Sequence, residues 1–123
     1  MISYLKGKII NKGAGFVIAE INNIGYQIFV SPLFYADLAI GHEVEFYTHQ
    51  YVREDALNLY GFRGMAELEL FELLLSISGI GPRSALAVMS IASVADIKNS
   101  IGHGDPALLT KVSGIGRKTA ERV

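Results

Sequence analysis

The hydrophobic pattern of the chain changes once, near residue 64, and this change limits the folds that the chain can adopt. Before it, apolar residues such as Val44 and Phe46 alternate with polar ones, which is the two-residue period of a strand with one buried face. After it, Leu68, Phe71 and Leu74 recur at helical spacing beside glutamates. The sequence therefore predicts an α+β fold in which strands come first and helices follow.

The change of pattern predicts two small domains, residues 1–64 and 65–123. A chain of 123 residues with 50% hydrophobic content is long enough for one ordinary domain or two small ones. The expected strands of the first domain are residues 2–11, 15–21, 26–31, 43–53 and 56–61. Ser31 followed by Pro32 predicts a short helix after the third strand, since serine caps helices and proline favours the first helical position. Five antiparallel strands with this helix indicate a closed, OB-like β-barrel.

The second domain contains an internal repeat. The segment Ile77–Ala85 returns 35 residues later as Val112–Ala120, and both copies contain Ser-Gly-Ile-Gly. Each copy predicts a helix, a tight Gly-Ile-Gly turn and a second helix that begins with a cation and a hydroxyl. The expected helices are residues 65–77, 82–90, 93–101, 105–111 and 117 to the end.

The repeated turns predict two phosphate sites. Glycines leave the backbone bare, and the N–H groups at the start of the following helix, aided by the helix dipole, attract an anion. The candidate phosphate-binding residues are Gly79, Ile80, Gly81, Arg83 and Ser84 in the first copy, and Gly114, Ile115, Gly116, Arg117, Lys118, Thr119 and Arg122 in the second. Two such hairpins would hold two phosphate strands without reading the base sequence.

Composition excludes several other classes of site. The chain has no cysteine and three scattered histidines, so we expect no disulfide and no metal site. The glycine spacing fits neither a dinucleotide loop nor a Walker A loop, so we expect no ATP site or other cofactor. The formal net charge is -1, and the local excess of cations after Pro106 is modest. DNA binding would therefore need several copies of the chain acting together.

Three features together resemble the RuvA family of bacterial Holliday junction branch migration subunits. They are the start Met1-Ile2, the segment Thr48–Phe62 and the doubled Gly-Ile-Gly turns. The resemblance implies a non-catalytic homotetramer, or an octamer, that holds a four-way DNA junction open in recombination and repair. It also implies a cytoplasmic location without a membrane anchor, the hexameric ATPase RuvB as the motor that uses ATP, and the resolvase RuvC as a further partner.

In the RuvA family the tip between the fourth and fifth strands is an acidic pin, which the resemblance assigns to Glu54 and Asp55, with Arg53 beside them. Four copies around a fourfold axis would bring eight carboxylates to the place where an unbroken duplex must pass. Like charges about 4 Å apart repel by about 1 kcal/mol in water and about 4 kcal/mol near a protein surface. The pin would therefore favour a junction over linear duplex.

RuvA-like chains continue into a third helical domain that docks on RuvB, and no segment here resembles it, so we expect coupling to the motor to be weak or lost.

The main alternative function is a duplex or single-strand DNA-binding module without junction specificity, for which Tyr47 and Tyr51 would be the stacking candidates. A DNA glycosylase and a pure assembly module are further alternatives. The glycosylase would need a larger helical domain around its catalytic residue.

Overall fold

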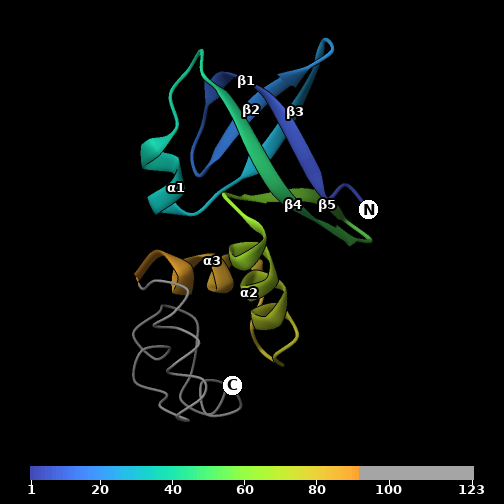
Figure 1. The fold of residues 1–123 in the computed structure, drawn as a ribbon. Coiled ribbons are helices and arrows are strands. Elements are labelled where there is room, and N and C mark those ends of the chain that lie inside the picture. The colour runs from blue at the N-terminus through green and yellow to red at the C-terminus, as the bar shows by residue number, and fades with distance from the viewer. Residues whose placement is uncertain (92–123) are drawn as a thin grey trace. The chain divides into compact units, whose positions relative to one another are not determined.

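A computed structural model of the chain describes residues 1–91. The chain divides into two compact units, and the boundary lies between Leu68 and Glu69. The first unit begins with three strands, continues through a short helix and ends with two more strands (Figure 1). These elements are β1 (Tyr4–Lys12), β2 (Phe16–Ile21), β3 (Ile24–Phe29), α1 (Pro32–Asp37), β4 (Glu43–Arg53) and β5 (Ala56–Phe62), followed by α2 (Met65–Leu75) and α3 (Pro82–Ile91). The α+β order of strands and then helices is confirmed.

The five strands form a closed barrel in the order β1-β2-β3-β5-β4. Strand β1 has two partners, because its residues from Tyr4 to Lys8 pair with β4 and those from Lys8 to Lys12 pair with β2. A register shift between Ile9 and Asn11 bends β1 from one partner to the other. The pairing of β3 with β5 closes the barrel, so the predicted OB-like barrel is confirmed. This pairing is parallel, so the expectation that all five strands are antiparallel was wrong. The chain passes through α1 and β4 between β3 and β5, and such a crossover lets the two strands run in the same direction.

The core of the barrel comes from the inward side of the alternating pattern. It consists of Ile9, Val17, Ala19, Ile28, Val30, Phe34, Leu38 and Phe46, which are all buried. Helix α1 contributes Phe34, whose ring centroid lies 5.7 Å from that of Phe46 on β4. The short helix between β3 and β4 is therefore part of the barrel core.

Both ends of α1 are capped. The Ser31 hydroxyl accepts a hydrogen bond from the Phe34 N–H at 3.3 Å, as the serine-proline pair predicts. At the other end, the Lys12 ammonium donates to the carbonyls of Tyr35 at 3.0 Å and Leu38 at 2.6 Å. A cation at a helix C-terminus also complements the helix dipole, so Lys12 fixes α1 against β1.

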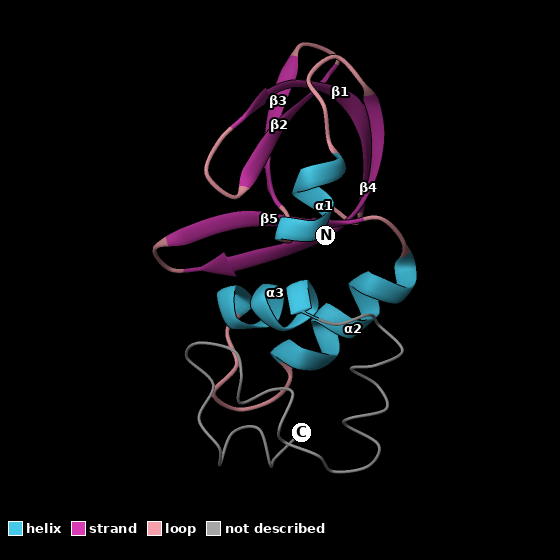
Figure 2. Cartoon of the chain, turned by 90° about the vertical axis from the view of Figure 1, so that its left-hand side faces the viewer, coloured by secondary structure: helices cyan, strands magenta, loops and turns pink. Residues whose placement is uncertain are grey.

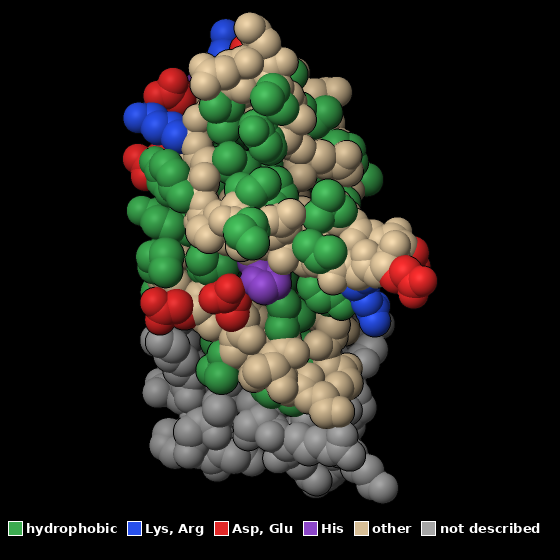
Figure 3. All heavy atoms as spheres, turned by 90° about the vertical axis from the view of Figure 1, so that its right-hand side faces the viewer, with side chains coloured by type: hydrophobic (Ala, Val, Ile, Leu, Met, Phe, Trp, Pro, Cys, Tyr) green, Lys and Arg blue, Asp and Glu red, His purple; other side chains and the backbone are tan. Residues whose placement is uncertain are grey.

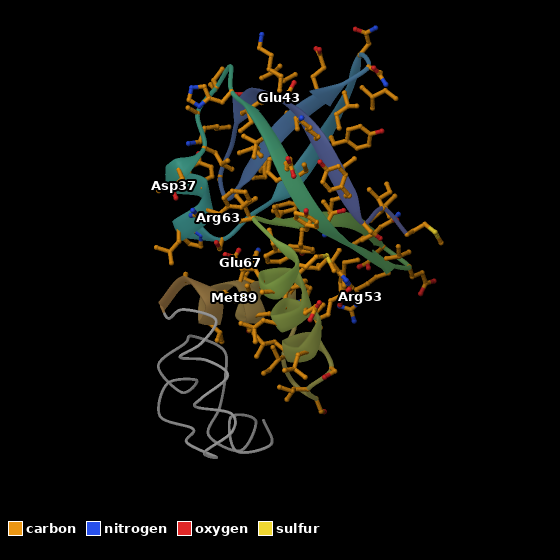
Figure 4. All side chains as sticks on the ribbon, viewed as in Figure 1. Asp37, Glu43, Arg53, Arg63, Glu67 and Met89 are labelled. Carbon is orange, nitrogen blue, oxygen red and sulfur yellow. The ribbon has the colours of Figure 1, made fainter. Side chains whose placement is uncertain are left out.

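Arg63 joins the end of β5 to α1. Its guanidinium forms an ion pair with Asp37 at 2.5 Å and donates to the Leu33 carbonyl at 3.1 Å (Figure 4). The Arg63 N–H donates to the Glu67 carboxylate at 3.4 Å in the first turn of α2. Side-chain bonds of Arg63 therefore fix the segment that follows β5.

Several predicted boundaries were wrong by one or two residues. Strand β1 begins at Tyr4 rather than at residue 2, and β3 ends at Phe29 rather than at residue 31. Strand β3 begins at Ile24 rather than at residue 26, because Asn22 and Asn23 have φ values of 50° and 69° and form a two-residue hairpin turn. Helix α2 ends at Leu75 rather than at residue 77. The helices expected over residues 93–101, 105–111 and from 117 onward lie outside the described residues.

The barrel interior leaves no room for a side chain at Gly61. A Cβ atom there would lie 2.5 Å from Ile28 Cγ2 and 3.0 Å from Phe46 Cδ1. We predict that Gly61→Ala lowers the free energy of unfolding by about 1–3 kcal/mol, the usual cost of overpacking a core. Urea unfolding of the full chain measures this change. Gly64→Ala is the control, because no atom of the described residues, apart from Gly64 itself and its chain neighbours, lies within 4 Å of a Cβ atom there. Equal urea midpoints for both variants would contradict the prediction.

Candidate nucleic-acid interface

The hairpin of β4 and β5 extends past the closed part of the barrel (Figure 2). The last contacts of β4 with the N-terminal segment involve Gln50, whose side-chain oxygen accepts the Ile2 N–H at 3.1 Å. The last pairing of β5 with β3 toward the hairpin turn is that of Leu59 with Ile28. Beyond these positions, no other strand among residues 1–91 pairs with either edge. Residues 51–58 therefore form a two-stranded extension of the hairpin, which we call the ribbon.

The ribbon ends in a two-residue acidic turn. Glu54 and Asp55 connect the paired residues Arg53 and Ala56, and both carboxylates are exposed. Figure 3 shows carboxylates at the far end of the projecting hairpin, with a basic side chain close by. The predicted pin residues thus lie together at the point of the ribbon that is farthest from the paired barrel strands.

One face of the ribbon carries a cation on aromatic rings. The Arg53 guanidinium lies 5.7 Å from the centroid of the Tyr51 ring, and the Tyr60 ring is 6.3 Å from that of Tyr51. Tyr47, the other stacking candidate, packs edge-on against Tyr4 at 5.4 Å. Both candidate rings therefore already have neighbours, and the arrangement favours a positioned Arg53 over two free stacking surfaces.

The first glycine turn lies between α2 and α3. Gly79 has φ of 92°, a left-handed conformation that side-chain-bearing residues rarely adopt. Ile80 is only 6% exposed, and its N–H donates to the Ile77 carbonyl at 3.1 Å. Gly79 and Gly81 are exposed on either side of it. The isoleucine thus anchors the turn while the two glycines leave backbone at the surface.

The start of α3 is open to an anion. The Ala85 N–H makes the first bond of the helix, to the Gly81 carbonyl at 3.0 Å, so the N–H groups of Arg83 and Ser84 precede the bonded turns. No acidic residue occupies the first turn, and the Arg83 side chain is exposed. Among the atoms of residues 1–91, apart from those of Gly81 itself and its chain neighbours, none lies within 4 Å of the place that a Cβ atom on Gly81 would take. The backbone there is accessible to a phosphate oxygen.

The second copy of the turn is not described. Gly114, Ile115, Gly116, Arg117, Lys118, Thr119 and Arg122 all lie outside residues 1–91. Their assignment to a phosphate site rests on the sequence repeat alone. The geometry of the first copy therefore carries the structural argument.

Within residues 1–91, no three carboxylate or imidazole groups are arranged to hold a metal ion. In the same part of the chain, no helix has the length and apolar character needed to cross a membrane. The polar groups proposed for nucleic-acid contact are the ribbon carboxylates and Arg53 in the first unit, and the first turn of α3 in the second unit. Their chemistry suits contact with a charged polymer.

Sequence reasoning missed the exposed apolar pair Val52 and Leu57, which lie opposite each other next to the acidic turn. The alternation through β4 predicted that Val52 would face a buried side, yet 66% of it is exposed. The alternation itself is correct, but the barrel that would bury Val52 has ended at Gln50. The spacing between the last barrel contact and the turn was the missing signal.

The chain is similar in sequence to known proteins over both of its parts. Residues 1–61 match the family model of the RuvA N-terminal domain, and residues 71–123 match a SAM-like tandem helix-hairpin-helix model. The chain belongs to the RuvA family. It is 44% identical, over its whole length, to proteins from Clostridium botulinum strain Hall and Clostridium perfringens that are named "Holliday junction branch migration complex subunit RuvA". This RuvA-family chain spans 63% and 62% of the lengths of those two relatives.

The accessible backbone at Gly81 provides a direct test of phosphate contact. We predict that Gly81→Ala weakens DNA binding about tenfold, because a methyl group would occupy the approach to charge-assisted hydrogen bonds. Gel-shift titration with junction and duplex DNA measures the change, and circular dichroism checks that the helices remain. Ser90→Ala, near the other end of α3, should bind as the unchanged chain does. Unaltered affinity of Gly81→Ala would remove this turn from the interface.

Proposed function

We propose that this chain binds four-way DNA junctions and holds them open for branch migration in homologous recombination and DNA repair. The observation that carries the proposal is the exposed Glu54-Asp55 turn at the end of a ribbon that leaves the barrel. A surface that binds DNA through phosphates gains nothing from carboxylates unless they exclude part of the DNA. A junction differs from a duplex at its centre, and that is where such a tip would discriminate between them.

The glycine turns would attract the DNA phosphates, which the acidic tip repels. The accessible start of α3, with Gly79, Gly81, Arg83 and Ser84, supports one phosphate site per chain. The repeated sequence from Gly114 to Arg122 supports a second site of the same kind. Contacts of this kind fix the DNA backbone and carry no base specificity, which suits a protein that must act on any sequence.

We propose further that the chain acts as a homotetramer, either single or paired into an octamer, so that four tips meet at the crossover. The named relatives are subunits of a branch migration complex, which supports the ATPase RuvB as the motor and the resolvase RuvC as a partner. On this proposal the chain is not an enzyme and uses no cofactor, because the motor hydrolyses ATP. Its place of action is the bacterial cytoplasm, where the chromosome lies.

The alternative is a DNA-binding module without junction specificity. The exposed Arg53 on the outer face of the ribbon favours it, since a cation there could hold any strand. The adjoining carboxylates oppose it, because they repel the phosphates of a continuous duplex. Relative affinity for junction and duplex therefore separates the two functions.

We predict that the double variant Glu54→Gln and Asp55→Asn binds linear duplex at least about fivefold more tightly, since about 1 kcal/mol of repulsion is removed. Its preference for junctions should fall correspondingly. Gel-shift competition between a four-way junction and a duplex of the same sequence measures both quantities. The control is Glu20→Gln with Glu43→Gln, which removes the same charge from exposed positions outside the tip. Junction preference that is undiminished in the tip variant would refute the pin.

A further inference from the structure

The ribbon has an apolar face directly behind its acidic turn. Val52 and Leu57 are paired across the two strands, so their side chains lie on the same side of the ribbon. They are 66% and 67% exposed, the highest values for Val and Leu among the exposed large hydrophobic residues of the described chain. Arg53 and Tyr51, by contrast, lie on the opposite face, because side chains alternate along a strand.

The exposure of this pair follows from the register of the barrel. Thr48 lies on the same side of β4 as Val52 and is only 2% exposed, because the barrel surrounds it. Gln50 comes next on that side, and its side-chain oxygen accepts a hydrogen bond from the Ile2 N–H. Val52 is the first such position beyond the barrel, and Leu57 is its counterpart on β5. The interior face of the barrel thus continues into solvent as an apolar surface two residues wide.

We propose that Val52 and Leu57 contact the nucleobases at the centre of the junction. This inference rests on the proposed function and adds a second role to the same tip. The carboxylates of Glu54 and Asp55 exclude phosphates from the end of the ribbon, so bases are the part of the DNA that can lie beside it. Opened base pairs present apolar faces, and apolar side chains are used elsewhere to separate base steps.

The charge distribution over the ribbon supports bases as the occupant of this face. Arg53 provides a cation for a phosphate strand on the Tyr51 side, at 5.7 Å from that ring. The Val52 side has only apolar groups next to the acidic turn, which suits an uncharged base and not the backbone. A separated strand could therefore keep its phosphates on one face of the ribbon and its bases on the other. The acidic turn would repel the phosphates, and the apolar pair would hold the opened bases.

The test uses a four-way junction with 2-aminopurine at the crossover, whose fluorescence rises when the base unstacks. We expect the unchanged chain to raise this fluorescence, and Val52→Thr with Leu57→Thr to reduce the rise at least twofold. Affinity for linear duplex should stay unchanged. Threonine retains β-propensity, so the ribbon should remain folded. Ile24→Thr is the matched control, because Ile24 is 55% exposed beside the other hairpin turn and should leave the signal unaltered.

Three outcomes would overturn the inference. If the double threonine variant gives the same fluorescence rise as the unchanged chain, Val52 and Leu57 do not hold the bases. If instead the variant sediments as a smaller species without DNA, a second copy of the chain covers the pair. If the unchanged chain shows neither junction preference nor a fluorescence rise, the proposed function fails, and the inference fails with it.

Discussion

The pairing of β4 with β5 is the constraint on which both the barrel and the candidate interface depend. The same ladder runs from Tyr47 and Phe62, within the barrel, to Arg53 and Ala56 at the tip. Because each step alternates the side chains, the register that sends Thr48 into the core also sets which residues face outward on the ribbon. A shift of one residue would exchange the faces that carry Arg53 and Val52.

The two kinds of surface have opposite electrostatic roles. The start of α3 offers the N–H groups of its first turn and the Arg83 side chain to an anion, whereas Glu54 and Asp55 repel one. Either surface alone would be unremarkable, since helix termini attract anions and hairpin turns are often charged. Their occurrence in one RuvA-family chain makes selection by DNA shape physically reasonable. On the proposed function, attraction would fix the arms and repulsion would exclude a continuous duplex from the centre.

Much of this arrangement could be predicted from the sequence, because it depends on local patterns. Alternation located the five strands, Ser31 and Pro32 located α1, and the glycine repeat located the turn before α3. The closing contacts could not be predicted in this way. The hydrogen bond from Lys12 on β1 to the Leu38 carbonyl and the ion pair of Arg63 with Asp37 join residues far apart in the sequence, and no local signal marks them. The exposure of Val52 was missed for the same reason, since it depends on where the barrel closes.

The central claim is that the acidic tip lies at the crossover while the glycine turns lie on the arms. The chain has no cysteine, so Ala56→Cys and Ser78→Cys each create a single attachment point for an iron chelate that cleaves nearby DNA backbone. Mapping the cleavage of a bound four-way junction tests the claim most directly. We expect cleavage centred on the crossover from position 56 and within the arms from position 78. Cleavage of the arms from position 56, or the same pattern from both positions, would contradict it.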